Sequence, residues 1–142
     1  MIAQAPAGKL KLEVVTPAGM VVSDAVDEVV LPGIEGEFGV LPGHVPLLTA
    51  LKIGQMAYRQ GGETHYIAVS WGYVEVTHHK VMVLAETAEK AMDIDVGRAE
   101  LDKAEAEKLL LGAKSDTEDE IAKIRLEKAL TRVQVARKIG KE

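Results

Sequence analysis

The chain has 142 residues, a hydrophobic fraction of 47% and a formal net charge of −5. This size and hydrophobic content favour one or two small globular domains and exclude a disordered protein, while the negative charge argues against nucleic acid as a partner. Because the sequence contains no cysteine, disulfides, thiolate zinc sites and cysteine nucleophiles are excluded.

The sequence offers no candidate membrane-spanning or secretory segment. The amino terminus lacks the basic start and the apolar core of a signal peptide. The longest uncharged apolar run, residues 38–51, is too short to span a bilayer and contains Pro42 and Pro46. We therefore expect contact with a membrane only through a partner protein.

Residues 1–87 have the pattern of an antiparallel β-sandwich built from short strands. Leu10, Leu12 and Val14 alternate with charged residues, the period of a half-buried strand. Similar short apolar runs follow, separated by turn signals such as Gly61-Gly62 and by a turn expected at His78-His79.

The composition changes near Glu86, and residues 88–142 have the pattern of an antiparallel two-helix hairpin. Asp95 is the expected N-cap of the first helix, and Gly112 is suited to the C′ position after it. Ser115 and Glu118 match a capping box at the start of a second helix, expected from Asp116 to Ile139.

The expected contact between these helices is rich in alanine. The second helix carries Ala122, Leu126, Ala129, Val133 and Ala136 on one stripe, and the first carries Ala99, Ala106 and Leu110, with Ala104 nearby. Burial of apolar surface stabilises a fold by about 25 cal/mol per Å². Alanine buries little apolar area, so such a contact is weaker than one made of leucine and isoleucine. We infer as a hypothesis that the hairpin can open; a permanently docked hairpin is the alternative.

The second helix also carries an excess of basic residues, among them Lys123, Arg125, Lys128 and Arg132. Such a helix suits an acidic protein surface or a phosphate ligand, and a solvated polar face is the alternative. The sequence offers no catalytic or metal site, because its histidines lack metal-ligand spacing and no nucleophile motif is present. We therefore predict a protein that is not an enzyme and requires no cofactor.

The densest motif is EGEFGVLPGHVPLLT, residues 35–49, which taken alone is a turn-rich corner of a sandwich. With residues 12–17, 70–76 and 81–88, it resembles the epsilon subunit of the bacterial F-type ATP synthase. The resemblance implies a peripheral rotor-stalk subunit of a proton-translocating enzyme, on the cytoplasmic face of the bacterial inner membrane. Its sandwich would join the gamma subunit to the c-subunit ring, with Glu37 facing the ring and His44 near gamma.

The same resemblance implies a role for the hairpin and a possible ATP site. The hairpin would extend along gamma toward the alpha/beta catalytic head and inhibit ATP hydrolysis, with Lys123, Arg125, Lys128 and Arg132 as its basic contacts. The run Ile94-Asp95-Val96-Gly97-Arg98-Ala99 matches a motif through which some members bind regulatory ATP. Glu89 and Arg132 stand at further matching positions of that site, and Lys128 stands at another of its positions.

Two departures from that ATP motif concern charge. Lys128 stands where an arginine is found, and Glu105 stands at a further basic position. Without ATP, Asp95 would be only an N-cap and Arg98 only a surface charge. A stand-alone nucleotide-sensing module, whose hairpin folds on binding ATP, is the alternative function.

Overall fold

The structure is a computed structural model that describes residues 5–141, and it divides into two compact units, Met1–Lys90 and Ala91–Glu142. The division after Lys90 lies beyond residue 87, where the composition placed it. The cause is the last strand, β8, which stays paired with β7 up to Lys90 opposite Ile67.

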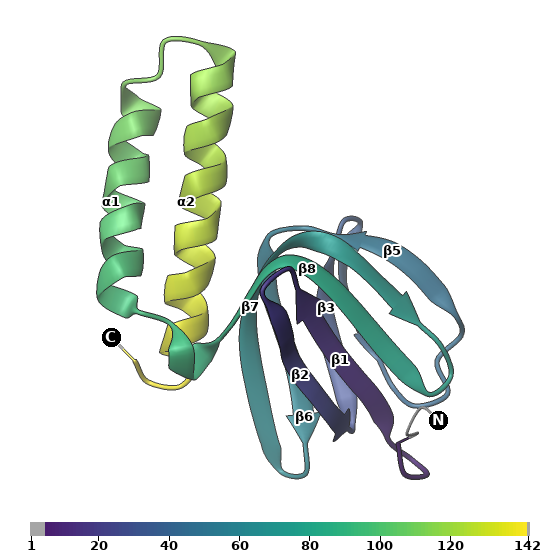
Figure 1. Ribbon diagram of the computed structural model, residues 1–142. Helices are drawn as coiled ribbons and strands as arrows, with labels where there is room; N and C mark the ends of the chain where they lie inside the picture. The colour runs from purple at the N-terminus through teal and green to yellow at the C-terminus, as the bar shows by residue number, and fades with distance from the viewer. Residues whose placement is uncertain (1–4, 142) are drawn as a thin grey trace. The chain divides into compact units, whose positions relative to one another are not determined.

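The first unit is a β-sandwich of eight strands (Figure 1). The strands are β1 (Leu10–Thr16), β2 (Gly19–Val26), β3 (Glu28–Gly33), β4 (Gly36–Val40), β5 (Leu47–Leu51), β6 (Gly54–Gln60), β7 (Glu63–Val76) and β8 (Lys80–Lys90). The predicted turns at Gly61-Gly62 and His78-His79 are confirmed, since they join β6 to β7 and β7 to β8.

The strands are paired in the order β2-β1-β8-β7-β5-β3-β4, and β6 joins β3 to β7. The predicted sandwich is confirmed, with two differences. Strand β7 has 14 residues. Its first half pairs with β6 and its second half pairs with β5, so this one strand belongs to both layers of the sandwich. The pairing of β1 with β8 is parallel rather than antiparallel.

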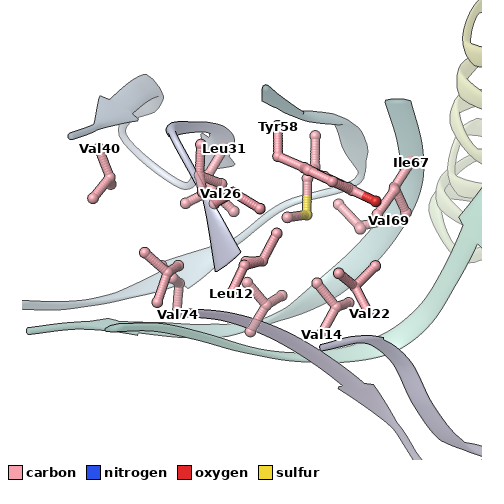
Figure 2. Close-up of a cluster of buried hydrophobic side chains, with 14 of the residues drawn as sticks. Leu12, Val14, Val22, Val26, Leu31, Val40, Tyr58, Ile67, Val69 and Val74 are labelled. Atoms are coloured by element: carbon pink, nitrogen blue, oxygen red, sulfur yellow. The ribbon is translucent and has the colours of Figure 1, made fainter. Parts of the chain in front are cut away.

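The core of the sandwich is aliphatic and lies between the two layers (Figure 2). The alternation of the first strand is confirmed, since Leu10, Leu12 and Val14 are fully buried. They pack in one cluster with apolar side chains from the other strands, including Val26, Leu31, Met56, Tyr58, Ile67, Val69, Val74 and Val83. Burial of this apolar surface is the main stabilising contribution to the sandwich.

The second unit begins with a short 3-10 helix, Ala91–Asp93, followed by α1 (Val96–Leu111) and α2 (Asp116–Arg137), which form the predicted hairpin (Figure 1). The N-caps are confirmed: Asp95 accepts a hydrogen bond from the N–H of Arg98 (3.1 Å), and Ser115 accepts one from Glu118 (3.1 Å). No helix within residues 5–141 is both long and apolar enough to cross a membrane.

The helix ends differ from the expectation in three details. Glu118 accepts from the N–H of Lys114 (2.7 Å), one residue before the N-cap that a capping box would use. Gly112 has a φ of −93° instead of the left-handed C′ conformation, because its N–H still bonds to the carbonyl of Lys108. Helix α2 ends at Arg137 rather than Ile139, since the chain tightens into turns before Gly140.

The alanine seam is present between α1 and α2, with half-buried leucines at its margins. Ala99 and Ala106 of α1 are buried, as are Ala122, Ala129, Val133 and Ala136 of α2. Leu110 and Leu126 are only half-buried, and Ala104 is exposed rather than part of the seam. The contact between the helices therefore depends mainly on small side chains.

Candidate functional site

Glu37 is the second residue of β4, next to the turn that joins β3 to β4. Glu37 lies opposite Pro32 in the β3–β4 ladder and is exposed. The turn is held to β5 by backbone hydrogen bonds from Ile34 to Ala50 (2.9 Å) and from Lys52 to Pro32 (3.1 Å). A carboxylate and the exposed Ile34 are thus placed on an anchored turn.

His44 lies at the other end of β4, in the loop that leads to β5. The loop is anchored by a hydrogen bond from the N–H of Gly43 to the carbonyl of His78 (2.9 Å), and the ring Nδ1 of His44 lies 2.6 Å from the carbonyl oxygen of Val45. Because β4 has five residues and a strand rises about 3.3 Å per residue, the structure does not bring Glu37 and His44 together.

An apolar row crosses the outward face of five strands. The ladder places Met20 opposite Val15, Val15 opposite Leu84, Leu84 opposite Tyr73, and Tyr73 opposite Ala50. We call these five residues the outer apolar row. Tyr73 and Leu84 are 61% and 51% exposed, and contiguous exposed apolar surface of this kind is typical of an interaction site.

The outer apolar row was missed by the sequence reasoning. The signal was present in β7 and β8, where Tyr73 and Leu84 occupy the alternate positions that a half-buried strand gives to polar residues. Their alignment into one row depends on the register of the strands.

The residues of the possible ATP motif lie at the start of α1 and its approach. Ile94 and Ala99 are buried, and Asp95 and Arg98 are exposed. Asp95 has the N-cap role that was its alternative reading. Because the N-terminus of a helix carries a partial positive charge, this turn is electrostatically suited to an anion.

Arg98 and Arg132 meet at one carboxylate. The Nε of Arg98 lies 3.1 Å from Oδ1 of Asp102, and Nη1 of Arg132 lies 3.4 Å from Oδ2 of the same side chain. Arg98 and Asp102 are one turn apart on α1, whereas Arg132 comes from α2. The structure therefore brings two of the candidate ATP-site residues, Arg98 and Arg132, to the same carboxylate, and it adds an acidic residue that the sequence reasoning did not consider.

The other residues assigned to the possible ATP site lie in different places. Lys128 is half-buried on α2, one turn before Arg132. Glu89 is half-buried on β8, opposite Ala68 of β7, and so belongs to the first unit. Glu105 lines a hollow of about 690 Å³ between the helices together with Arg125.

The four basic residues assigned to inhibition do not share one face of α2. Lys123 pairs with Asp119 (2.8 Å), and this hydrogen bond raises the pKa of Lys123. At about 100° per residue, Arg125, Lys128 and Arg132 form a single stripe, while Lys123 points roughly 160° away from Arg125. The stripe, not Lys123, flanks the alanine seam.

Further contacts secure the base of the hairpin, where α1 begins and α2 ends. Arg137 lies 3.5 Å from Oε1 of Glu100. The ammonium of Lys141 donates to the carbonyls of Met92 and Ile94, both at 2.8 Å. Within residues 5–141, no group of three His, Asp or Glu side chains could hold a metal ion.

Comparison with protein families gives two matches that together span both units. Residues 9–91 match the ATP synthase delta/epsilon chain β-sandwich domain, and residues 92–137 match the long α-helix domain of the same chain. The ATP synthase epsilon chain 2 of Syntrophotalea carbinolica is 50% identical over 137 residues, covering 95% of this chain and 99% of that one. The ATP synthase epsilon chain of Citrifermentans bemidjiense is 52% identical over 136 residues, with the same coverage.

Two solved structures share the fold at low sequence identity. A chain of the Euglena gracilis mitochondrial ATP synthase assembly of OSCP, F1 and c-ring has a TM-score of 0.80 at 20% identity, covering 96% of this chain and 86% of its own. A chain of the Tetrahymena thermophila mitochondrial ATP synthase central stalk and c-ring has a TM-score of 0.56 at 12% identity, covering 96% and 98%. The chain therefore belongs to the delta/epsilon family of ATP synthase central-stalk subunits, as an epsilon chain of the bacterial type.

Proposed function

We propose that the sandwich couples the c-subunit ring to the gamma subunit and that the hairpin inhibits ATP hydrolysis. In this proposal the chain is a peripheral subunit without a catalytic site of its own, on the cytoplasmic face of the bacterial inner membrane. The observation that carries the proposal is the division after Lys90 into two units that each have their own internal packing. Such a division lets one unit stay assembled while the other changes its contacts.

Two features of the sandwich surface support its role as a coupler. The anchored turn with Glu37 suits the polar, basic loops of a c ring, because charges at the edge of an interface set its register and orientation. The outer apolar row suits gamma, since an exposed apolar surface favours burial in a stable contact. The loop with His44 lies at the opposite end of β4 from Glu37, so ring and gamma can be contacted at the same time.

The hairpin has the features of a unit that can change its packing. Its seam depends on alanines, whose burial contributes little per residue. Its base is held by partly exposed ion pairs, each of which contributes only about 0.2–1 kcal/mol. Separation of α1 from α2 would present Arg125, Lys128 and Arg132 to the acidic surface of an alpha/beta head.

The test is to compare the full chain with a chain that ends at Lys90, each reconstituted into the complete ATP synthase. This end keeps the β7–β8 ladder complete, whereas ending at residue 87 would remove its last paired residues. We expect the shortened chain to assemble with gamma and the c ring while ATP hydrolysis rises. Unchanged hydrolysis would contradict the inhibitory role of the hairpin, and failure to bind gamma would contradict the coupling role of the sandwich.

A second function, sensing of ATP by the folded hairpin, is favoured by the convergence of Arg98 and Arg132 near the first turn of α1. Guanidinium groups bind phosphate oxygens through paired N–H donors, and the helix N-terminus adds positive potential. Equilibrium dialysis of the full chain with millimolar ATP tests this. We expect Arg98→Ala and Arg132→Ala to reduce binding and Arg137→Ala, whose partner is Glu100, to leave it unchanged. Absence of binding to the wild-type chain would refute it.

A further inference from the structure

The Asp102 carboxylate lies between two arginines. One oxygen faces Arg98 at 3.1 Å, and the other faces Arg132 at 3.4 Å. The side chains of Asp102 and Arg132 are 34% and 24% exposed, so this pair is partly shielded from water, whereas the side chain of Arg98 is 65% exposed. Shielding strengthens both the attraction within the group and the repulsion of a second anion.

A phosphate group makes the same kind of contact with a guanidinium as this carboxylate does. Both present negatively charged oxygen atoms that accept charge-assisted N–H hydrogen bonds, the carboxylate as a planar group and the phosphate as a tetrahedral one, and an arginine already held by one of them has fewer donors for the other. A polyphosphate that approaches Arg98 and Arg132 must therefore displace Asp102 or lie beside its negative charge. Either route lowers the affinity for the polyphosphate.

We propose that Asp102 is an internal counter-anion that competes with the phosphates of ATP for Arg98 and Arg132. This inference rests on the proposed nucleotide site. Asp102 has two opposed effects: it weakens ATP binding, and through its interhelical pair with Arg132 it keeps α1 on α2 when ATP is absent. The competition for the two arginines raises the ATP concentration at which the site is half occupied.

The test uses Asp102→Asn in the full chain, because asparagine has nearly the same shape and removes only the charge. Glu100→Gln is the matched control: it makes the same charge change two residues away on α1, at a carboxylate whose partner is Arg137. Equilibrium dialysis with ATP gives the dissociation constant of each chain. We expect Asp102→Asn to bind ATP about tenfold more tightly, a change of about 1.4 kcal/mol, and Glu100→Gln to bind as the wild type does.

Each remaining outcome decides against the proposal. Equal, measurable affinities for all three chains would refute the counter-anion and leave the nucleotide site standing. Equal tightening by both substitutions would mean that only overall charge matters. Absence of binding to all three would remove the nucleotide site together with this inference. Asp102→Ala, which favours the helix intrinsically, repeats the measurement if Asp102→Asn loses helical circular dichroism.

Discussion

Replacing Gly72 by alanine is expected to destabilise the sandwich severely. Gly72 lies in β7 where it is paired on one side with Leu51 of β5 and on the other with Ala85 of β8. Its φ is +149°, and an added Cβ would lie 1.8 Å from the carbonyl oxygen of Leu84 and 2.9 Å from Cα of Ala85. The atoms in the way are backbone atoms of a paired strand, so no side chain can rotate to make room.

The cost can be built from two contributions. A residue with a side chain in a conformation that only glycine favours costs about 1–3 kcal/mol. Moving β8 away from Gly72 adds the loss of ladder hydrogen bonds, each about 0.5–1.5 kcal/mol, and disturbs Leu84, which belongs to the outer apolar row. A total of about 3 kcal/mol or more would lower the melting temperature by at least ~12 °C, since 1 kcal/mol corresponds to roughly 4–8 °C in a domain of this size.

Trp71 gives the measurement, because the chain has one tryptophan and it lies in β7. Its fluorescence is followed during thermal and urea unfolding of the full chain. Gly39→Ala in β4 is the control, because the nearest atom to its added Cβ is the carbonyl oxygen of Val29 at 4.0 Å. We expect little change or a slight gain for the control. Similar stabilities for the two variants would refute the steric argument at Gly72.

Three further substitutions test other contacts. Asp27→Asn should make the free energy of unfolding fall less in acid, because the hydrogen bond from Lys9 keeps the pKa of the Asp27 carboxyl below its usual range. The stabilisation by the ionised Asp27 is present above the unfolded pKa of about 3.9 and is lost as the pH falls through the folded pKa. Urea unfolding across that pH range, with Glu28→Gln as control, measures this difference. Replacing both Tyr73 and Leu84 by serine should weaken gamma binding at least tenfold in a pull-down titration. The free energy of unfolding should change little, because both side chains are exposed. Unchanged gamma binding would exclude the outer apolar row as the gamma surface. Arg125→Gln should weaken inhibition of hydrolysis, more at low salt than at high salt; inhibition equal to wild type at low salt would exclude this contact.

Local features of the fold were predictable from the sequence because they depend on neighbouring residues. The alternation of Leu10, Leu12 and Val14 identifies a strand, and Asp95 and Ser115 identify the helix starts, since a cap bonds to an N–H only a few residues away. The parallel pairing of β1 with β8 could not be predicted in this way. This pairing joins the first and the last strand of the sandwich in sequence order, and the local residue pattern of neither strand indicates it.

The same distinction applies to the candidate site. The spacing of four between Arg98 and Asp102 is a visible helical pair, but the contribution of Arg132 depends on how α2 packs against α1. A match to a family motif directs attention to the residues that bind, and Asp102 is outside that motif. The competing anion therefore becomes visible only when the two helices are placed together.

The hairpin is secured differently at its two ends, and this bears on how it opens. At the base, Arg132 pairs with Asp102, Arg137 with Glu100, and Lys141 with two carbonyl groups. Toward the connecting loop the helices flank the hollow of about 690 Å³, which is lined by apolar side chains, including Leu109 and Ile121, and by charged ones, including Glu105 and Arg125. Ion pairs weaken with salt and respond to an added anion, whereas apolar contacts do not respond in this way. In the proposed ATP-sensing function, the ligand would therefore act at the base, where Asp102 lies between the two arginines.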